Sequence, residues 1–183
     1  MPRRSQTADE VGADAGGGFT SVRGAYDELG AAGFYAEHGS DYSNPHEDVL
    51  KAAMNTALSK WRAAGLLDGE LRRVLDLACG SGEASLAFEA WVQAQTADRI
   101  SPTVEACDPF TGEAYLARTG RTAHAWSFED IAGGILVDSP PFDLVLASFC
   151  LHLLERCWTQ PVCRAVGRPT LADLEERHGR DGR

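Results

Sequence analysis

The 183-residue sequence lacks the segments that would place it in a membrane or send it out of the cell. Its longest nearly apolar run, residues 144–154, is too short to cross a bilayer and contains His152. Arg3 and Arg4 stand near the N-terminus, but the apolar stretch of a secretory signal does not follow them. We therefore expect no membrane partner.

The sequence also lacks cysteine pairs of the kind that bind metals. There are 5 cysteines, an odd number, and no Cys-x-x-Cys spacing occurs. Three of them sit in apolar, strand-like runs, where cysteine behaves as a small core residue. This pattern favours a reducing, cytoplasmic setting and predicts no metal site.

Positive charge is scarce. The chain has 17 Lys and Arg against 27 Asp and Glu, a net charge of −10 at pH 7. Broad binding to the phosphates of a nucleic acid is therefore not expected. Apolar residues make up 44% and charged residues 24%, which is ordinary for one globular domain of this length.

The sequence is expected to divide into four parts. Residues 1–18 form a polar tail that ends in three glycines and is expected to be disordered. Residues 19–65 form an N-terminal lid segment and a helix, residues 66–155 form the main domain, and residues 156–183 form a divergent tail.

What is present is a strand, a glycine turn and a helix in direct succession. The apolar run at 74–78 leads into Gly80-Ser-Gly82, and residues 83–93 read as a helix. Glycine lets the backbone approach a ligand, and a helix N-terminus offers unpaired N–H groups. Ser85 stands where a dinucleotide fingerprint has its third glycine, and Asp76 precedes the turn. A carboxylate there suits a ligand with a positive amino group better than a pyrophosphate.

The run from Asp76 through Ala78 and Gly80 to Gly82 resembles motif I of the class I methyltransferases that use S-adenosylmethionine. The usual motif has glycine at the place of Ala78. The resemblance implies that these four residues hold the amino acid end of the cofactor.

A second expected strand, residues 103–107, ends at Asp108, which Pro109 and Phe110 follow. An acid at this place can accept hydrogen bonds from ribose hydroxyls. The resemblance implies that Asp108 binds the ribose and that Phe110 lies on the adenine. The alternative is that Asp108 is a turn acid before a proline.

After a short helix expected at 113–118, residues 123–128 read as a third strand. Asp130 follows, and the resemblance implies that it binds the adenine amino group, flanked by Phe128. The alternative for Asp130 is a surface turn.

Residues 141–154 resemble motif IV, with a fourth strand at 144–147. Asp143 has an expected structural role at the strand start. Ser148 and His152 then come nearest the methyl group and are the catalytic candidates, with His152 a general base or a packed or capping side chain.

The lid segment precedes a well-marked helix. Asn44 reads as the N-cap, Glu47 as its capping-box partner and Gly65 as the C-terminal cap. A similar aromatic segment closes over the cofactor in some methyltransferases, so Tyr35 and Tyr42 are predicted to contact the ligand. Alternatively, both tyrosines pack in the core.

Together these patterns predict an α/β fold, a Rossmann-like parallel sheet in the order 3-2-1-4 with helices on both faces. The resemblance implies that the chain is a methyltransferase, or the cofactor-binding portion of one, with S-adenosylmethionine as cofactor and a small molecule as the expected acceptor. A nicotinamide-dependent oxidoreductase and a non-catalytic interaction protein stay open. Only 29 residues follow Leu154, so the later strands of the family are expected to be missing. An uncovered sheet edge would then favour self-association.

Overall fold

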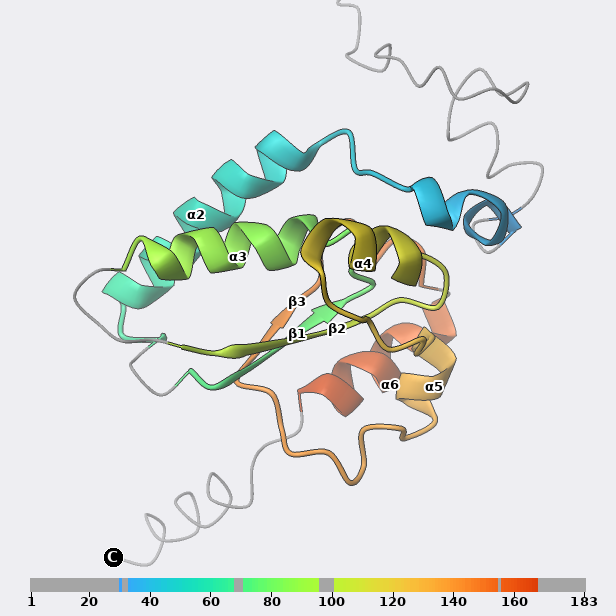
Figure 1. The fold of residues 1–183 in the computed structure, drawn as a ribbon. Helices are drawn as coiled ribbons and strands as arrows, with labels where there is room; N and C mark the ends of the chain where they lie inside the picture. The colour runs from blue at the N-terminus through green and yellow to red at the C-terminus, as the bar shows by residue number, and fades with distance from the viewer. Residues whose placement is uncertain (1–29, 31–32, 68–70, 96–100, 155, 168–183) are drawn as a thin grey trace, which may run out of the picture.

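A computed structural model describes residue 30 and residues 33–67, 71–95, 101–154 and 156–167. The tail predicted to be disordered, residues 1–18, lies outside these ranges. Within them the chain folds as a small parallel sheet with helices on both faces (Figure 1), so the predicted α/β class is confirmed.

The sheet has three parallel strands in the order β2-β1-β3. Strand β1 is Arg73–Leu77, β2 is Thr103–Cys107 and β3 is Leu144–Leu146. Leu75 of the central strand lies between Glu105 and Val145 in register. The three strands match three of the four expected from the sequence.

The strand predicted at 123–128 does not form. A single parallel bridge joins His124 to Cys107, in which His124 N donates to the Ala106 carbonyl at 2.8 Å. The ladder stops there because Ser127 caps α5 (Phe128–Ala132) only three residues later. Local capping therefore prevails over strand propensity in this segment.

One face of the sheet is covered by α2 (Glu47–Ala63) and α3 (Glu83–Gln93), which lie side by side in Figure 1. The short helix α4 (Gly112–Thr119) follows β2 at the end of the sheet where the strands finish. The indole N–H of Trp91 donates to Ser59 Oγ at 3.1 Å and ties α3 to α2. The buried side chains of this core include Leu50, Leu58, Val74, Phe88 and Leu146.

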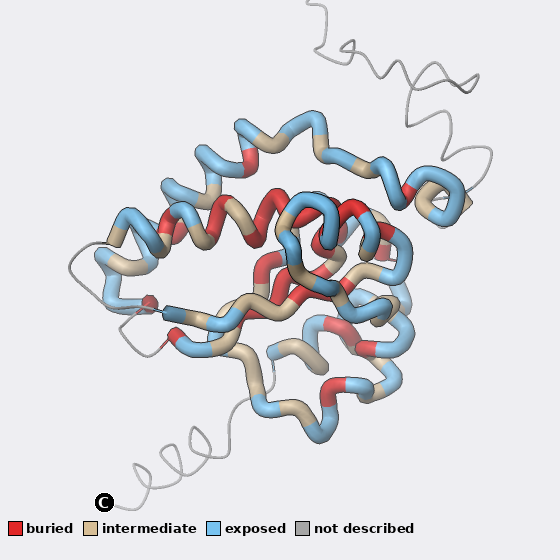
Figure 2. The backbone as a smooth tube through the Cα atoms, in the orientation of Figure 1, coloured by how far each residue is buried: buried red, intermediate tan, exposed pale blue. Residues whose placement is uncertain are grey.

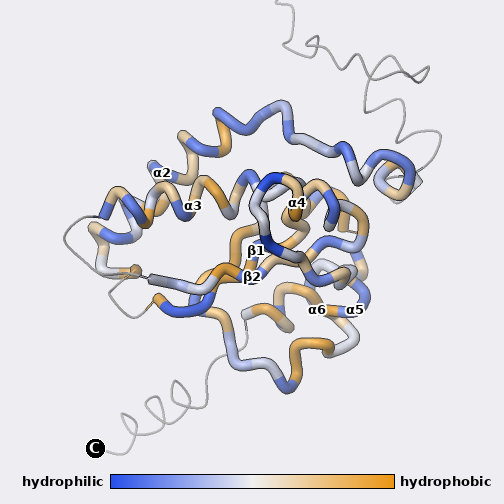
Figure 3. The backbone as a smooth tube through the Cα atoms, viewed as in Figure 1, coloured by the Kyte–Doolittle hydropathy of each residue, from blue (hydrophilic) through white to orange (hydrophobic). Residues whose placement is uncertain are grey.

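The opposite face is covered by α5 and α6 (Arg156–Val166). Because successive strand residues point to opposite sides, Val74 faces α2 and α3 whereas Leu75 faces this second core. Figure 2 shows the buried segments concentrated in the strands and the helix sides turned toward them, and Figure 3 shows hydrophobic residues along the strands. The buried members of the second core include Leu77, Ile131, Leu136 and Val162.

Helix α6 corrects an expectation from the sequence. Residues 156–183 are predicted to form a divergent tail, yet residues 156–166 form a helix with Val162 only 1% exposed. Pro161 lies inside this helix and lacks the N–H of a helical hydrogen bond, which weakens the sequence signal. Tertiary burial decides the structure here.

The capping box predicted for α2 is wrong. The helix begins at Glu47 with His46 as its N-cap residue, and no side chain caps it. Asn44 Oδ1 instead accepts a hydrogen bond from His46 N at 2.8 Å, and Glu47 pairs with Arg118 of α4. A distant arginine thus competes successfully for the carboxylate that local sequence assigned to the cap.

The other end of α2 follows the prediction. Gly65 has a positive φ of 72°, its N–H donates to the Arg62 carbonyl, and the N–H of Leu66 donates to the Trp61 carbonyl, each at 2.9 Å. This pattern satisfies the last carbonyls of the helix in the manner of a Schellman motif. In the part of the chain that the structure describes, no helix combines the length and apolar character needed to cross a membrane.

Candidate functional site

The glycine turn joins the end of β1 to the start of α3. Ala78, Gly80 and Gly82 all have positive φ, at 53°, 56° and 95° respectively. Only glycine adopts this conformation without a steric penalty, so Ala78 is strained where the resembling motif has glycine. Gly82 is the N-cap residue of α3, which brings the N-terminus of that helix to the turn.

Asp76 lies buried beneath the turn. Its Oδ2 atom accepts hydrogen bonds from Ser85 N at 3.0 Å and from Ser85 Oγ at 2.6 Å. Its Oδ1 atom is buried and has no hydrogen-bond partner among the described residues. Burial raises the pKa of this carboxyl to about 7, although the two bonds from Ser85 oppose the shift. Asp76 therefore ties strand to helix and leaves one acceptor unused.

Asp108 joins the end of β2 to the glycine turn. Its Oδ1 atom accepts from Phe110 N at 2.9 Å and from Thr111 N at 3.1 Å, and its Oδ2 atom accepts from Gly80 N at 3.3 Å. The turn role that the sequence offered as an alternative is thus present. Pro109, beside it, is exposed. Asp108 also holds the two loops of the site together.

Aromatic residues cover the turn. We call residues 33–46 the aromatic segment; it includes the 3-10 turn η1 (Gly39–Asp41). A side chain placed on Gly80 would come within 2.7 Å of the Tyr42 ring, so that ring lies directly on the glycine backbone. The Tyr35 ring lies edge-on to Tyr42 at 5.5 Å and stacks with Phe110 at 6.4 Å between ring centres.

The structure therefore brings Tyr35, Tyr42, Gly80, Asp108 and Phe110 together, although they come from three separate parts of the sequence. For Asp108 and Phe110 the order of strands and loops led to this prediction, and for Tyr35 and Tyr42 the resemblance to a lid did. Contact of these residues with a ligand stays a prediction.

The two catalytic candidates follow β3. Ser148 is half-buried, and His152 is exposed in a turn at 151–154 rather than in a helix. Between them, Phe149 has a positive φ of 52°, and its ring lies 5.9 Å from the ring of His46. This contact brings the loop after β3 to the start of α2, on the same side as the aromatic segment.

Asp130 and Phe128 lie in α5, below the sheet. Asp130 Oδ2 accepts from Ser127 N and Ser127 Oγ, both at 2.9 Å, and these bonds lower the pKa of the carboxyl. Ser127 Oγ in turn accepts from Asp130 N, which completes a capping box. Phe128 is half-buried against the second core. Both residues have a structural use, and a role beside adenine stays a prediction.

Sequence reasoning missed two residues of the site, Glu83 and Arg118. Glu83 directly follows the glycine turn and is only 4% exposed. Its Oε1 atom accepts from Ser81 Oγ at 2.6 Å and from Arg118 Nη1 at 3.3 Å. The acid in the first turn of α3 was visible in the sequence, but its partner comes from another helix.

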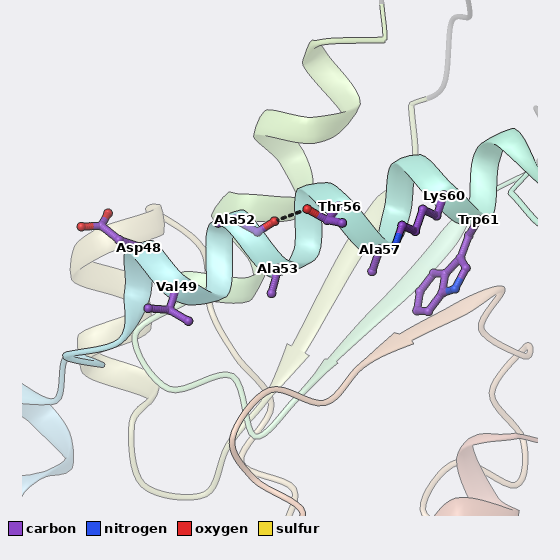
Figure 4. A pocket seen from close by; sticks show the side chains of 8 residues that line it. All are labelled: Asp48, Val49, Ala52, Ala53, Thr56, Ala57, Lys60 and Trp61. Carbon is purple, nitrogen blue, oxygen red and sulfur yellow. Dashed lines mark hydrogen bonds between the residues drawn. The ribbon is translucent and has the colours of Figure 1, made fainter. Parts of the chain in front are cut away.

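An apolar hollow runs along the outer side of α2 (Figure 4). None of the predicted site residues lines it, so we do not assign the cofactor to it. Among the described residues, no three His, Cys, Asp or Glu side chains gather as a metal site. The lining residues of the hollow are Asp48, Val49, Ala52, Ala53, Thr56, Ala57, Lys60 and Trp61.

The chain is similar to an uncharacterized protein of the fission yeast Schizosaccharomyces pombe. The two are 33% identical over 153 residues, which covers 66% of this chain and 60% of the relative. The chain therefore spans less than two thirds of that relative's length. It matches no protein-family model and no solved structure.

Proposed function

We propose that the chain binds S-adenosylmethionine at the glycine turn and is a methyltransferase, or the cofactor-binding portion of one. The observation that carries the proposal is the pair of carboxylates, Asp76 and Asp108, at the ends of two adjacent parallel strands beside this turn. The N-terminus of α3 adds a positive dipole end at the same place.

The residues present fit such a ligand. The buried Oδ1 atom of Asp76 has no hydrogen-bond partner among the described residues, which suits the positive amino group of the cofactor. Asp108 would bind the ribose. Gly80 has no side chain, so its backbone allows the close approach that a ligand needs, as the contact with the Tyr42 ring illustrates. Asp130 and Phe128 would bind the adenine from the first turn of α5. Ala78 and Gly82 shape the turn, and Pro109 flanks it.

We further propose that the sheet is the central part of a Rossmann-like sheet in the order 3-2-1-4. The bridge of His124 to Cys107 supports this proposal, because His124 pairs with the last residue of β2 on the side away from β1. Strand β3 would then correspond to the fourth strand of the family, and it would form the edge at which the family's later strands continue the sheet.

The chemistry depends on position more than on a dedicated catalytic group. The bound cofactor supplies an electrophilic methyl group to a nucleophile of the acceptor. The chain's own part is to hold both molecules in line and exclude water, which can contribute about 7–11 kcal/mol to lowering the barrier. Ser148 and His152, in the loop after β3, are the groups proposed nearest the acceptor, with His152 able to take a proton from it. The acceptor is proposed to be a small molecule.

Isothermal titration calorimetry with S-adenosylhomocysteine and with NADH tests the proposal. We expect heat from the first ligand and none from the second. Asp108→Asn should weaken binding by about 1–3 kcal/mol, because its amide NH2 cannot accept hydrogen bonds from ribose hydroxyls or from Gly80 N.

Asp143→Asn is the matched control. Asp143 Oδ2 accepts from Arg72 N and Arg73 N, each at 2.8 Å, at the opposite end of the sheet. This variant should keep the wild-type affinity. Equal affinity in the Asp108 and Asp143 variants would remove Asp108 from the site, and binding of NADH alone would favour an oxidoreductase.

Binding without turnover is the second candidate, and the short sheet favours it. Within the described residues β3 pairs with β1 alone, so the acceptor side of the site has no further strand beside it. On this reading the purified chain binds the cofactor but transfers no methyl group to a panel of small acceptors. Robust transfer by the same chain would exclude this candidate.

A further inference from the structure

A buried carboxylate joins the aromatic segment to the glycine turn. Glu83 Oε1 accepts a hydrogen bond from Asn44 N at 2.7 Å, in addition to the bonds from Ser81 Oγ and Arg118. Asn44 belongs to the aromatic segment, Ser81 to the turn and Arg118 to α4. One acid thus connects three parts of the site that are far apart in the sequence.

Arg118 makes the second connection. Its Nη1 atom donates to Ser81 Oγ at 3.2 Å as well as to Glu83, and its Nη2 atom pairs with the Glu47 carboxylate at the start of α2. The bond to Glu47 raises the pKa of Arg118, and the same bond lowers the pKa of Glu47. Arg118 therefore holds both the turn and the helix into which the aromatic segment runs.

We call Asn44, Glu47, Glu83 and Arg118 the clasp. Tyr42 precedes Asn44 by two residues, and its ring lies on the Gly80 backbone. With the clasp made, this ring covers the place where the ligand would approach the turn. The bond from Asn44 N to Glu83 fixes the backbone two residues after Tyr42, and it therefore supports the position of this ring over the turn.

Breaking the clasp has a cost that keeps it closed. Glu83 is almost fully buried, so loss of its partners leaves a charge without compensation in a poorly solvated place. The ion pair of Arg118 with Glu47 is more exposed, at 30% and 40%, and contributes less. The buried acid is therefore the main support of the closed position.

We propose that Glu83 and Arg118 are positioning residues that hold the aromatic segment over the glycine turn, and that release of the clasp controls entry and exit of the ligand. The identity of the ligand rests on the proposed function; the clasp itself does not.

The first experiment measures the clasp without any ligand, by amide hydrogen exchange of residues 39–46. Arg118→Met removes the guanidinium but leaves Glu83 in place. We expect exchange in this segment to be about tenfold faster, as for the loss of a hydrogen bond between charged groups.

Arg121→Met is the matched control. Arg121 lies two residues after the end of α4 and, like Arg118, pairs with a glutamate of α3, in this case Glu89. Its side chain is exposed to a similar extent, 36% against 30% for Arg118. The described contacts of Arg121 do not include the aromatic segment. Equal exchange of residues 39–46 in the two variants would overturn the clasp.

Glu83→Gln is a second variant for the case in which Arg118→Met unfolds. Its side-chain oxygen still accepts from Asn44 N, but the charge that attracts Arg118 is gone. We expect exchange of residues 39–46 to be faster than in the wild type. Exchange at the wild-type rate would count against Glu83 as a positioning residue.

The second experiment follows the binding of S-adenosylhomocysteine by stopped flow. If the clasp gates the site, association and dissociation should both become faster in Arg118→Met, and the dissociation constant should change less than either rate. Simple damage to the pocket would raise the dissociation rate alone and would overturn the gating. If the wild type does not bind this ligand, the proposed function fails, and hydrogen exchange alone decides the clasp.

Discussion

At the scale of single residues, the acids of the site combine a structural and a predicted binding role. Asp108 has both carboxylate oxygens engaged by backbone N–H groups, whereas Asp76 uses one oxygen and leaves the other buried without a partner among the described residues. A buried carboxylate with an unused acceptor is costly to ionise. Asp76 therefore contributes to the dependence of the stability of the chain on pH.

We predict that the contribution of Asp76 to the free energy of unfolding falls as the pH rises from about 4 to about 7. Burial raises its pKa from 3.8 to about 7. In this range the folded chain keeps a proton that the unfolded chain has released, so the contribution is complete at low pH and is lost as the pH passes through 7. The difference of about 3 in pKa (7 − 3.8) corresponds to about 4 kcal/mol.

Urea denaturation of the wild type and of Asp76→Asn at pH 5 and pH 8 measures this effect. The amide does not titrate, so the variant should lose less stability than the wild type between the two values. Parallel losses in the two proteins would show that Asp76 is ionised in the folded chain throughout.

At the scale of helices and strands, α6 is the element that differs most from the prediction made from the sequence. It places Val162 in the second core, against the side of the sheet that Leu75 and Leu77 face. Residues 156–166 were expected to belong to a divergent tail, and they instead cover a sheet face. The segment is therefore part of the folded domain.

We predict that Val162→Ala lowers the free energy of unfolding by about 2 kcal/mol, from two buried methyl groups at about 0.8 kcal/mol each and the cavity left behind. Gln160→Ala, at an exposed position of the same helix, should change it little. Thermal and chemical denaturation of both variants measure the difference. Equal stability of the two would mean that α6 does not support the domain.

At the scale of the whole molecule, the sheet is covered on both faces. In the part of the chain that the structure describes, however, β3 is an edge strand that pairs with β1 alone. The outer side of α2 is apolar too, with Val49 64% and Trp61 43% exposed (Figure 4). Exposed strand edges and apolar surfaces favour association with another chain.

We therefore predict that the chain self-associates. Its sedimentation coefficient should rise with concentration, and Val49→Glu should reduce the rise because it puts a charge on the apolar surface. Leu116→Glu, at a 46% exposed position on α4, is the control and should leave the rise unchanged. A single sedimentation coefficient at all concentrations would contradict the prediction.

The sequence alone determined the elements whose signals are local. The apolar run of β1, the Gly80 and Gly82 turn, and the Gly65 cap depend on backbone conformations that neighbouring residues dictate, and each was predicted. The order of the acids along the chain was enough to predict that Asp108 lies near the turn, because parallel strands end at one edge of a sheet.

The tertiary structure decided everything that depends on partners distant in the sequence. Glu47 pairs with Arg118 instead of capping its helix, and Glu83 is the buried acceptor for Asn44 N. Helix α6 forms although it contains a proline, with Val162 buried against the sheet. Ion pairs between helices and burial against a sheet arise only after the chain has folded. Local patterns carry no sign of them, and for that reason the support of the site was visible only in three dimensions.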